Sequence, residues 1–136
     1  MDKLIIAPTP STPDVYFSVD ENLFWITGNS RPENARAVYI PINEWIKELV
    51  DSIIAGKIST FNNANPLKFK IDLHYFNSSS AKFLYDICVE LRRLPDEGVP
   101  VNLEWYYEKD DPDMLEAGND ISTMVDMKFS FIQKEV

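Results

Sequence analysis

A run of small polar residues, Asn77–Ser80, stands between a strand-like and a helix-like segment and offers three hydroxyl groups. A hydroxyl in the first turn of a helix lies near free backbone amides and the positive end of the helix dipole, both of which stabilise a phosphate. A phosphoserine adds about −1.5 to −2 charge and three acceptor oxygens. Lys82 follows closely enough to pair with such a phosphate or with a partner's carboxylate. The segment is therefore a candidate phosphorylation site, although N-capping by one serine explains the same residues.

The stretch from Glu104 to Asp126 is strongly acidic and holds eight acids against one base, Lys109. Its loop lacks the central glycine and terminal glutamate of an EF-hand. Three interpretations stay open: a solvated helix cap, a partner-binding surface, or a metal site built from Asp110, Asp111 and Asp113. The cap is favoured, because carboxylates near a helix start complement the dipole and alone specify no metal geometry.

A third polar group lies in the break that runs from Gly28 to Asn34 and is rich in Gly, Asn, Ser and Pro. Glu33 and Asn34 are typical of a helix entry, where an Asn side chain caps free amides. Arg31 could instead reach the phosphate site from across the sheet edge. The break is thus a further candidate part of the site.

The elements that must position these residues follow from hydrophobic spacing, which predicts β-β-α-β-α-β-α-β. The predicted strands are 15–19, 23–27, 67–75, 101–107 and 129–132, and the predicted helices are 42–54 (with Pro41 in the first turn), 83–94 and 112–125. Because crossover connections are right-handed in nearly all proteins, the last four strands should run parallel, with 15–19 added antiparallel through a hairpin. The loops 30–34, 77–80 and 109–113 should then share one edge, where open α/β sheets place their sites.

Residues 1–13 contain three prolines and are predicted to be an extended lead-in to a single domain, 14–136. The period-two pattern of the strands predicts a sheet with one face only partly covered. Three aromatic side chains on apolar faces, Trp25, Trp45 and Trp105, are predicted to lie in the core. The fold class is α/β with a mixed, mostly parallel sheet.

Length and charge exclude several classes of function. The 136 residues carry a net charge of −9 and repel nucleic acid and anionic lipid. The sequence has one histidine, His74, and one cysteine, Cys88, which are too few for a His/Cys metal site or an intramolecular disulfide. No apolar run is long enough for a signal peptide or a membrane span, so a soluble, cytoplasmic protein is expected. A Walker loop, a dinucleotide glycine pattern and a Ser-His-Asp order are also missing, which disfavours a classical hydrolase or nucleotide-binding enzyme.

Four motifs in sequence resemble those of one family, the SiaC family of bacterial regulatory phosphoproteins. They are Thr12-Pro13, Gly28–Asn34, Tyr75–Lys82, and Trp105–Met114 followed by Glu116 and Gly118. Each motif is weak alone, but four in the right order and spacing cover nearly the whole chain and are specific. Such proteins are similar to STAS domains, the fold of anti-sigma factor antagonists.

The resemblance implies a partner-switching protein without catalytic residues, cofactor or metal. A dedicated ATP-dependent Ser/Thr-type kinase would phosphorylate the hydroxyl after the Asn, and a PP2C-type phosphatase would remove the phosphate. The unphosphorylated form would bind a downstream signalling protein, which in the pseudomonad members is a diguanylate cyclase. By position Ser78 matches the acceptor, with Ser79 the alternative. The expected contact residues are Asn77, Ser79, Ser80, Lys82, Arg31, Glu33, Asn34, Asp110 and Asp111. The alternatives are a constitutive adaptor that is not phosphorylated and, less favoured, a carboxylate-based metal-dependent hydrolase.

Overall fold

The computed structural model describes residues 1–135, which form an α/β domain of six strands and three helices. In chain order the elements are β1 (Leu4–Ile6), β2 (Asp14–Ser18), β3 (Leu23–Ser30), α1 (Ala35–Ile54), β4 (Leu67–Phe76), α2 (Ser78–Asp96), β5 (Val101–Glu108), α3 (Pro112–Val125) and β6 (Ser130–Lys134).

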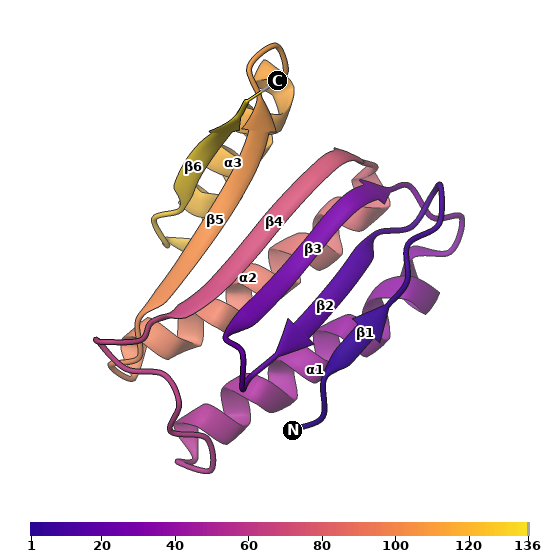
Figure 1. The fold of residues 1–136 in the computed structure, drawn as a ribbon. Helices are drawn as coiled ribbons and strands as arrows, with labels where there is room; N and C mark the ends of the chain where they lie inside the picture. Colours follow the sequence, from indigo (N-terminus) through magenta and orange to yellow (C-terminus); the bar gives the residue numbers. More distant parts are fainter. Residues whose placement is uncertain (136) are drawn as a thin grey trace.

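All six strands belong to one sheet, and their order across the sheet is their order in the chain (Figure 1). The pairs β1–β2 and β2–β3 are antiparallel, and the pairs β3–β4, β4–β5 and β5–β6 are parallel. The predicted hairpin and the predicted parallel strands are therefore confirmed. The C-terminal ends of β3, β4 and β5 consequently lie at one edge of the sheet.

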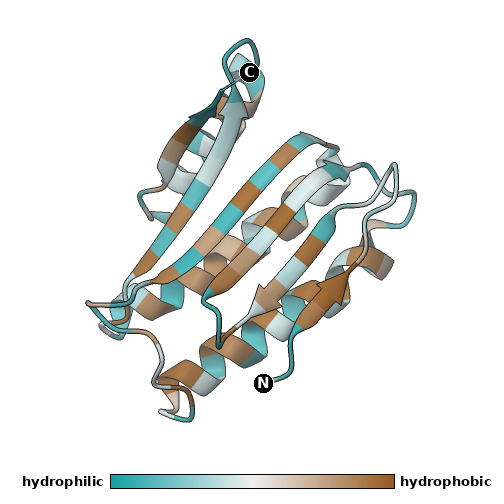
Figure 2. Ribbon diagram, in the orientation of Figure 1, coloured by the Kyte–Doolittle hydropathy of each residue, from teal (hydrophilic) through white to brown (hydrophobic). Residues whose placement is uncertain are grey.

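The three helices lie on the same face of the sheet (Figure 1). Alternating hydrophobic and hydrophilic bands along β4 are visible in Figure 2. Phe69, Ile71 and Leu73 are buried in the core beneath the helices. Lys70 and Asp72, between them in the strand, are only half-buried on the other face. The predicted one-sided cover of the sheet is confirmed.

The tryptophans divide between the two faces. Trp105 is fully buried in the core, and Trp45 is half-buried against Phe17, with 5.2 Å between ring centroids. Trp25 instead stacks on Tyr16 at 4.7 Å and lies outside the core. Its neighbours along β3 take the inward positions, and side chains alternate along a strand, so Trp25 must point away from the helices. The prediction that it belongs to the core was wrong.

The N-terminal residues contribute to the sheet rather than only leading into it. Leu4–Ile6 forms the edge strand β1, which pairs with β2 in the register Leu4–Phe17 to Ile6–Val15. Leu4 and Ile6 pack against the core, whereas Ile5 points outward and is exposed. The prolines begin only after this strand, so the lead-in expected over 1–13 is corrected to a proline-rich connection that follows β1.

Two element boundaries differ from the expected ones. Strand β3 continues past Gly28, which adopts a φ of +97°, and ends at Ser30. Helix α1 begins at Ala35, where the Asn34 side chain caps it by accepting from the Ala37 amide. Pro41 therefore lies inside the helix, not in its first turn as predicted. Its ring is exposed, and as an interior proline it lacks the amide donor that would bond the carbonyl of Ala37.

Candidate functional site

The edge formed by the ends of β3, β4 and β5 carries the candidate residues. Ser30 is paired with Phe76, and the Asn77 amide donates to the Ser30 carbonyl at 2.9 Å. Between β4 and β5, His74 Nδ1 lies 3.8 Å from a carboxylate oxygen of Glu108. The serine turn (Asn77–Ser80) and the acidic loop (residues 109–113) therefore lie at the same edge of the sheet as the end of β3, as the crossover argument predicted.

The first turn of α2 distinguishes the exposed serines from each other. Asn77 caps the helix, and its Oδ1 accepts from the Ser80 amide at 2.9 Å and from the Ser79 hydroxyl at 3.0 Å. The Ser78 hydroxyl is exposed and has no hydrogen-bond partner among residues 1–135. Of the two solvent-facing serines, Ser78 therefore has the free hydroxyl.

The third serine belongs to a buried chain of hydroxyl groups. Ser80 Oγ donates to the Ser30 carbonyl at 3.1 Å, and Ser30 Oγ donates to Ser80 Oγ at 2.8 Å. Because both serine protons are then used, the Tyr39 hydroxyl must donate to Ser30 Oγ, 2.6 Å away. Burial raises the pKa of Tyr39, which keeps this proton in place. Each buried hydroxyl proton has an acceptor.

This hydroxyl chain fixes the start of α2 against β3 and α1. Ser30 and Ser80 are both completely buried, and Tyr39 also stacks on Phe83 with 5.4 Å between ring centroids. Ser80 was expected on the contact surface, and its burial removes it from that surface. Sequence reasoning missed Ser30 and Tyr39 as its partners, since no local pattern links residues so far apart in the chain.

Among residues 1–135, neither Lys82 nor Arg31 makes a side-chain hydrogen bond with the serines of this turn. Lys82 Nζ pairs with Asp86 at 3.2 Å, one turn further along α2. The Arg31 backbone amide donates to the Ser11 carbonyl at 2.8 Å, and Arg31 itself is exposed. A phosphate on Ser78 would therefore meet the helix amides first.

The remaining expected residues separate into caps and free charges. Asn34 caps α1, and Asp111 caps α3 by accepting from the Met114 amide at 3.1 Å. Both fit the capping interpretation of their motifs. Glu33 and Asp110 are exposed side chains. Within residues 1–135, His, Cys, Asp and Glu side chains form no group of three or more that could hold a metal ion.

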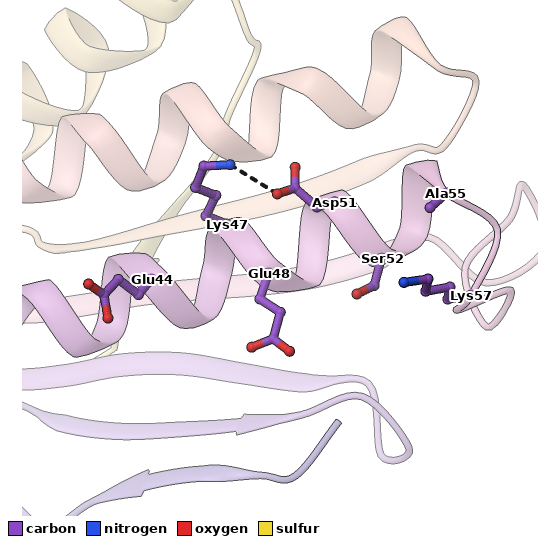
Figure 3. Close-up of a pocket in the computed structure, with 7 residues that line it drawn as sticks. All are labelled: Glu44, Lys47, Glu48, Asp51, Ser52, Ala55 and Lys57. Carbon is purple, nitrogen blue, oxygen red and sulfur yellow. Dashed lines mark hydrogen bonds and ion pairs between the residues drawn. The ribbon is translucent and has the colours of Figure 1, made fainter.

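Two hollows in the surface are large enough to take a side chain of a partner. One, of about 450 Å³, lies over α1 among solvated charges, where Lys47 pairs with Asp51 at 2.9 Å (Figure 3). The other, of about 310 Å³, lies between the end of β4 and the start of α3 and is lined by Phe76, Met114 and Ala117 together with acidic residues. This second hollow, the β4–α3 groove, shares the edge of the sheet with the serine turn. No helix in the described chain is both long and apolar enough to cross a membrane.

Comparison with known proteins identifies the family. The model for "SiaC family regulatory phosphoprotein" matches residues 6–134, almost the entire chain. The chain belongs to the SiaC family. A relative from Pseudomonas aeruginosa strain UCBPP-PA14 is 28% identical over 109 residues, which cover 80% of this chain and 79% of that protein.

Solved SiaC structures share the fold of this SiaC-family chain. The crystal structure of apo-SiaC from Pseudomonas aeruginosa matches with a TM-score of 0.76 and 26% identity, over 99% of this chain and 100% of that one. A second match is to the crystal structure of the diguanylate cyclase SiaD in complex with its activator SiaC, also from Pseudomonas aeruginosa. It has a TM-score of 0.80 and 24% identity, over 96% of this chain and 99% of the matched chain. The α/β class expected from the sequence is therefore confirmed, as is the family resemblance.

Proposed function

We propose that this chain is a non-enzymatic partner-switching regulator, controlled by reversible phosphorylation of Ser78, whose unphosphorylated form binds and regulates a diguanylate cyclase. A Ser/Thr-type kinase would add the phosphate and a PP2C-type phosphatase would remove it. One observation carries the proposal: in a chain of a regulatory phosphoprotein family, the hydroxyl that opens α2 is exposed and makes no hydrogen bond within residues 1–135. The cyclase partner is carried over from the relative SiaC, which activates SiaD.

Ser78 is favoured over its neighbours by what each hydroxyl already does. Phosphorylating Ser79 would break its bond to Asn77 Oδ1 and place a dianion against that acceptor. Phosphorylating Ser80 would require α2 to leave the buried contact with Ser30. Transfer to Ser78 breaks no hydrogen bond among residues 1–135.

A phosphate on Ser78 acts on the recognition surface rather than on the fold. The free amides and dipole at the start of α2 tolerate negative charge, so the helix persists. A partner packed over the same turn would lose close contact and would have to desolvate the dianion. Such a loss amounts to several kcal/mol, and about 4 kcal/mol reduces affinity roughly a thousandfold.

The site is tested by incubating the protein with its cognate kinase and ATP and locating phosphate by mass spectrometry. We expect one phosphate on the peptide that holds Ser78, lost in Ser78→Ala and kept in Ser79→Ala. The Ser79→Ala variant is the matched control, because it removes a neighbouring exposed hydroxyl from the same turn. Phosphate that persists in Ser78→Ala would move the acceptor elsewhere, and a protein that is never phosphorylated would favour the constitutive adaptor.

The switch is tested by the affinity of the cognate diguanylate cyclase for four forms of the chain: the wild type, Ser78→Ala, the form phosphorylated at Ser78, and Ser59→Asp. We expect Ser78→Ala to bind as the wild type does, and phosphorylated Ser78 to bind at least a hundredfold more weakly. Ser59→Asp adds a charge in the exposed loop before β4, at the opposite edge of the sheet, and should leave the affinity unchanged. Equal affinities of the phosphorylated and unphosphorylated forms would overturn the proposal.

A further inference from the structure

The β4–α3 groove is lined by apolar side chains, which we call its floor, by the carboxylates of Asp111 and Asp113, which we call its rim, and by His74 and Tyr75. Phe76, Met114 and Ala117 line its interior, and its volume is about 310 Å³. Met114 is nearly buried, whereas Phe76 and Ala117 keep part of their surface open to solvent. The floor is therefore accessible apolar surface at an edge where most neighbours are polar.

The charges around this groove have one predominant sign. Asp111 and Asp113 line it, and the nearby Glu108 faces His74 at 3.8 Å. One carboxylate oxygen of Asp111 accepts the hydrogen bond that caps α3. The Asp113 carboxylate is exposed and has no hydrogen bond or ion pair among residues 1–135. Between Glu104 and Asp126 acids outnumber bases eight to one. A basic group in the groove would thus meet the Asp113 carboxylate, which makes no hydrogen bond or ion pair within residues 1–135.

Tyr75 adds an aromatic surface to the same groove. Its side chain, near the end of β4, lines the groove and is 50% exposed. A guanidinium group stacks well on such a ring and forms paired hydrogen bonds with a carboxylate, while its three methylene groups pack on apolar surface. The floor, ring and free carboxylate together present the three surfaces that an arginine side chain uses.

From this geometry we infer that the β4–α3 groove binds an arginine side chain of the partner, which anchors the partner beside the Ser78 turn. The inference rests on the proposed function, because it takes the partner to be the cyclase that the unphosphorylated chain binds. Phe76 is the last residue of β4, and only Asn77 separates it from Ser78, the first residue of α2. One docked segment would therefore contact the groove and the phosphorylation site together.

Arginine fits this groove better than the other anchors. An acidic or neutral polar side chain would leave Asp113 unpaired or repel it. A purely aliphatic anchor would fill the floor but place no positive charge on the rim. Lysine supplies the charge, but its ammonium group neither stacks on Tyr75 nor bonds a carboxylate through two parallel hydrogen bonds.

The first test measures the affinity of the cognate cyclase for two groove variants of the full chain. Asp113→Asn removes the free carboxylate, and we expect about tenfold weaker binding and a shallower dependence on salt. Ala117→Leu fills the floor without a change of charge, and it should weaken binding by a similar factor or more. Asp120→Asn makes the same charge change at another exposed position of α3, outside the groove, and should bind as the wild type does.

The failure of this inference differs from a failure of the proposed function. If the wild type binds the cyclase and phosphate on Ser78 weakens binding, but Asp113→Asn and Ala117→Leu both bind normally, the groove is not the anchor site. Equal losses for Asp113→Asn and Asp120→Asn would reduce the effect to overall charge and would also overturn it. If the wild type does not bind the cyclase at all, the proposed function fails first, and a second measurement decides the groove.

That second measurement needs no partner. N-acetyl-arginine amide and the neutral isostere N-acetyl-citrulline amide are titrated at millimolar concentrations into the isotopically labelled chain and followed by NMR. We expect saturable shifts at Tyr75, Phe76 and Ala117 for the arginine amide alone, and their loss in Asp113→Asn. Equal shifts for both compounds, or no saturable shifts at these residues, would overturn the inference.

Discussion

Tyr39, Ser30 and Ser80 form a chain of buried hydroxyl groups in which every proton has an acceptor. The middle member, Ser30, accepts from the tyrosine and donates to the other serine. Removing it leaves a buried donor without an acceptor, whereas removing the tyrosine hydroxyl leaves only a spare lone pair on Ser30. The two losses are therefore unequal, because an unsatisfied buried donor costs more than a missing neutral hydrogen bond.

We expect Ser30→Ala to lower the free energy of unfolding by about 1–3 kcal/mol and Tyr39→Phe to lower it by about 0.5–1.5 kcal/mol. The double variant should cost less than the sum, because it removes the donor that Ser30→Ala leaves unpaired. Urea unfolding of the wild type and the three variants measures these differences. A loss for Tyr39→Phe equal to or above that for Ser30→Ala would contradict the assigned direction of the hydroxyl protons.

Single residues show how far the sequence predicts the site. A cap within Asn77–Ser80 follows from residue type and spacing, because capping is decided within four residues, although Asn77 and not a serine supplies it. The burial of Ser80 does not, because its partner Ser30 is 50 positions away and meets it only when β3 lies beside β4. Local patterns predict which residues open a helix, whereas long-range packing decides which of them stay accessible.

At the scale of elements, α3 approaches β5 closely at one point. A Cβ on Gly118 would lie 2.5 Å from Trp105 Nε1, which itself donates to the Met114 carbonyl at 3.0 Å. The indole ring therefore occupies the space that a side chain at this position of α3 would need. Glycine holds the helix against the strand here because it has no Cβ.

We expect Gly118→Ala to destabilise the protein by about 1–3 kcal/mol, because the helix must move away from a buried indole ring. In an exposed helix the same change usually stabilises by up to about 1 kcal/mol, so the sign of the effect is diagnostic. Asn119→Ala, at the next and exposed position of α3, is the matched control and should change stability little. Thermal and urea unfolding compare the two, and a stabilised Gly118→Ala would contradict the close contact.

Where the observed ends of strands and helices differ from those predicted from the sequence, the difference has a physical cause. A strand of three residues, Leu4–Ile6, is too short for an alternating pattern and forms only because β2 offers an edge. Strand β3 passes Gly28 because pairing with β4 outweighs the turn propensity of glycine and asparagine. Helix α1 begins before Pro41 because Asn34 supplies the cap. The order and direction of the elements were predictable, whereas their ends depended on neighbours.

At the scale of the whole molecule, Cys88 reports on the integrity of the core. Its side chain is completely buried, and burial raises the pKa of its thiol to about 12. The folded protein therefore keeps the thiol proton at a pH where the unfolded chain releases it. The stability from this group is present below the ordinary thiol pKa and is lost as pH rises toward the folded value.

We expect native protein to react with a thiol reagent far more slowly than the chain in urea, because labelling of Cys88 requires opening of the core. When opening is fast, the labelling rate should increase about tenfold for each 1.4 kcal/mol of stability that Gly118→Ala loses. Mass spectrometry of timed samples measures both rates. Labelling of the folded chain at the rate of a free thiol would contradict the buried position of Cys88.

The agreement between strand order in the sheet and strand order in the chain has a consequence for biosynthesis. Each new strand emerging from the ribosome finds its pairing edge already made, so the sheet can grow in one direction without waiting for a later segment. Ser30, Tyr39 and Ser80 all precede β5, whereas the groove also needs α3. The turn that carries Ser78 would thus be assembled first on the nascent chain, and the groove beside it would be completed only when the last helix docks.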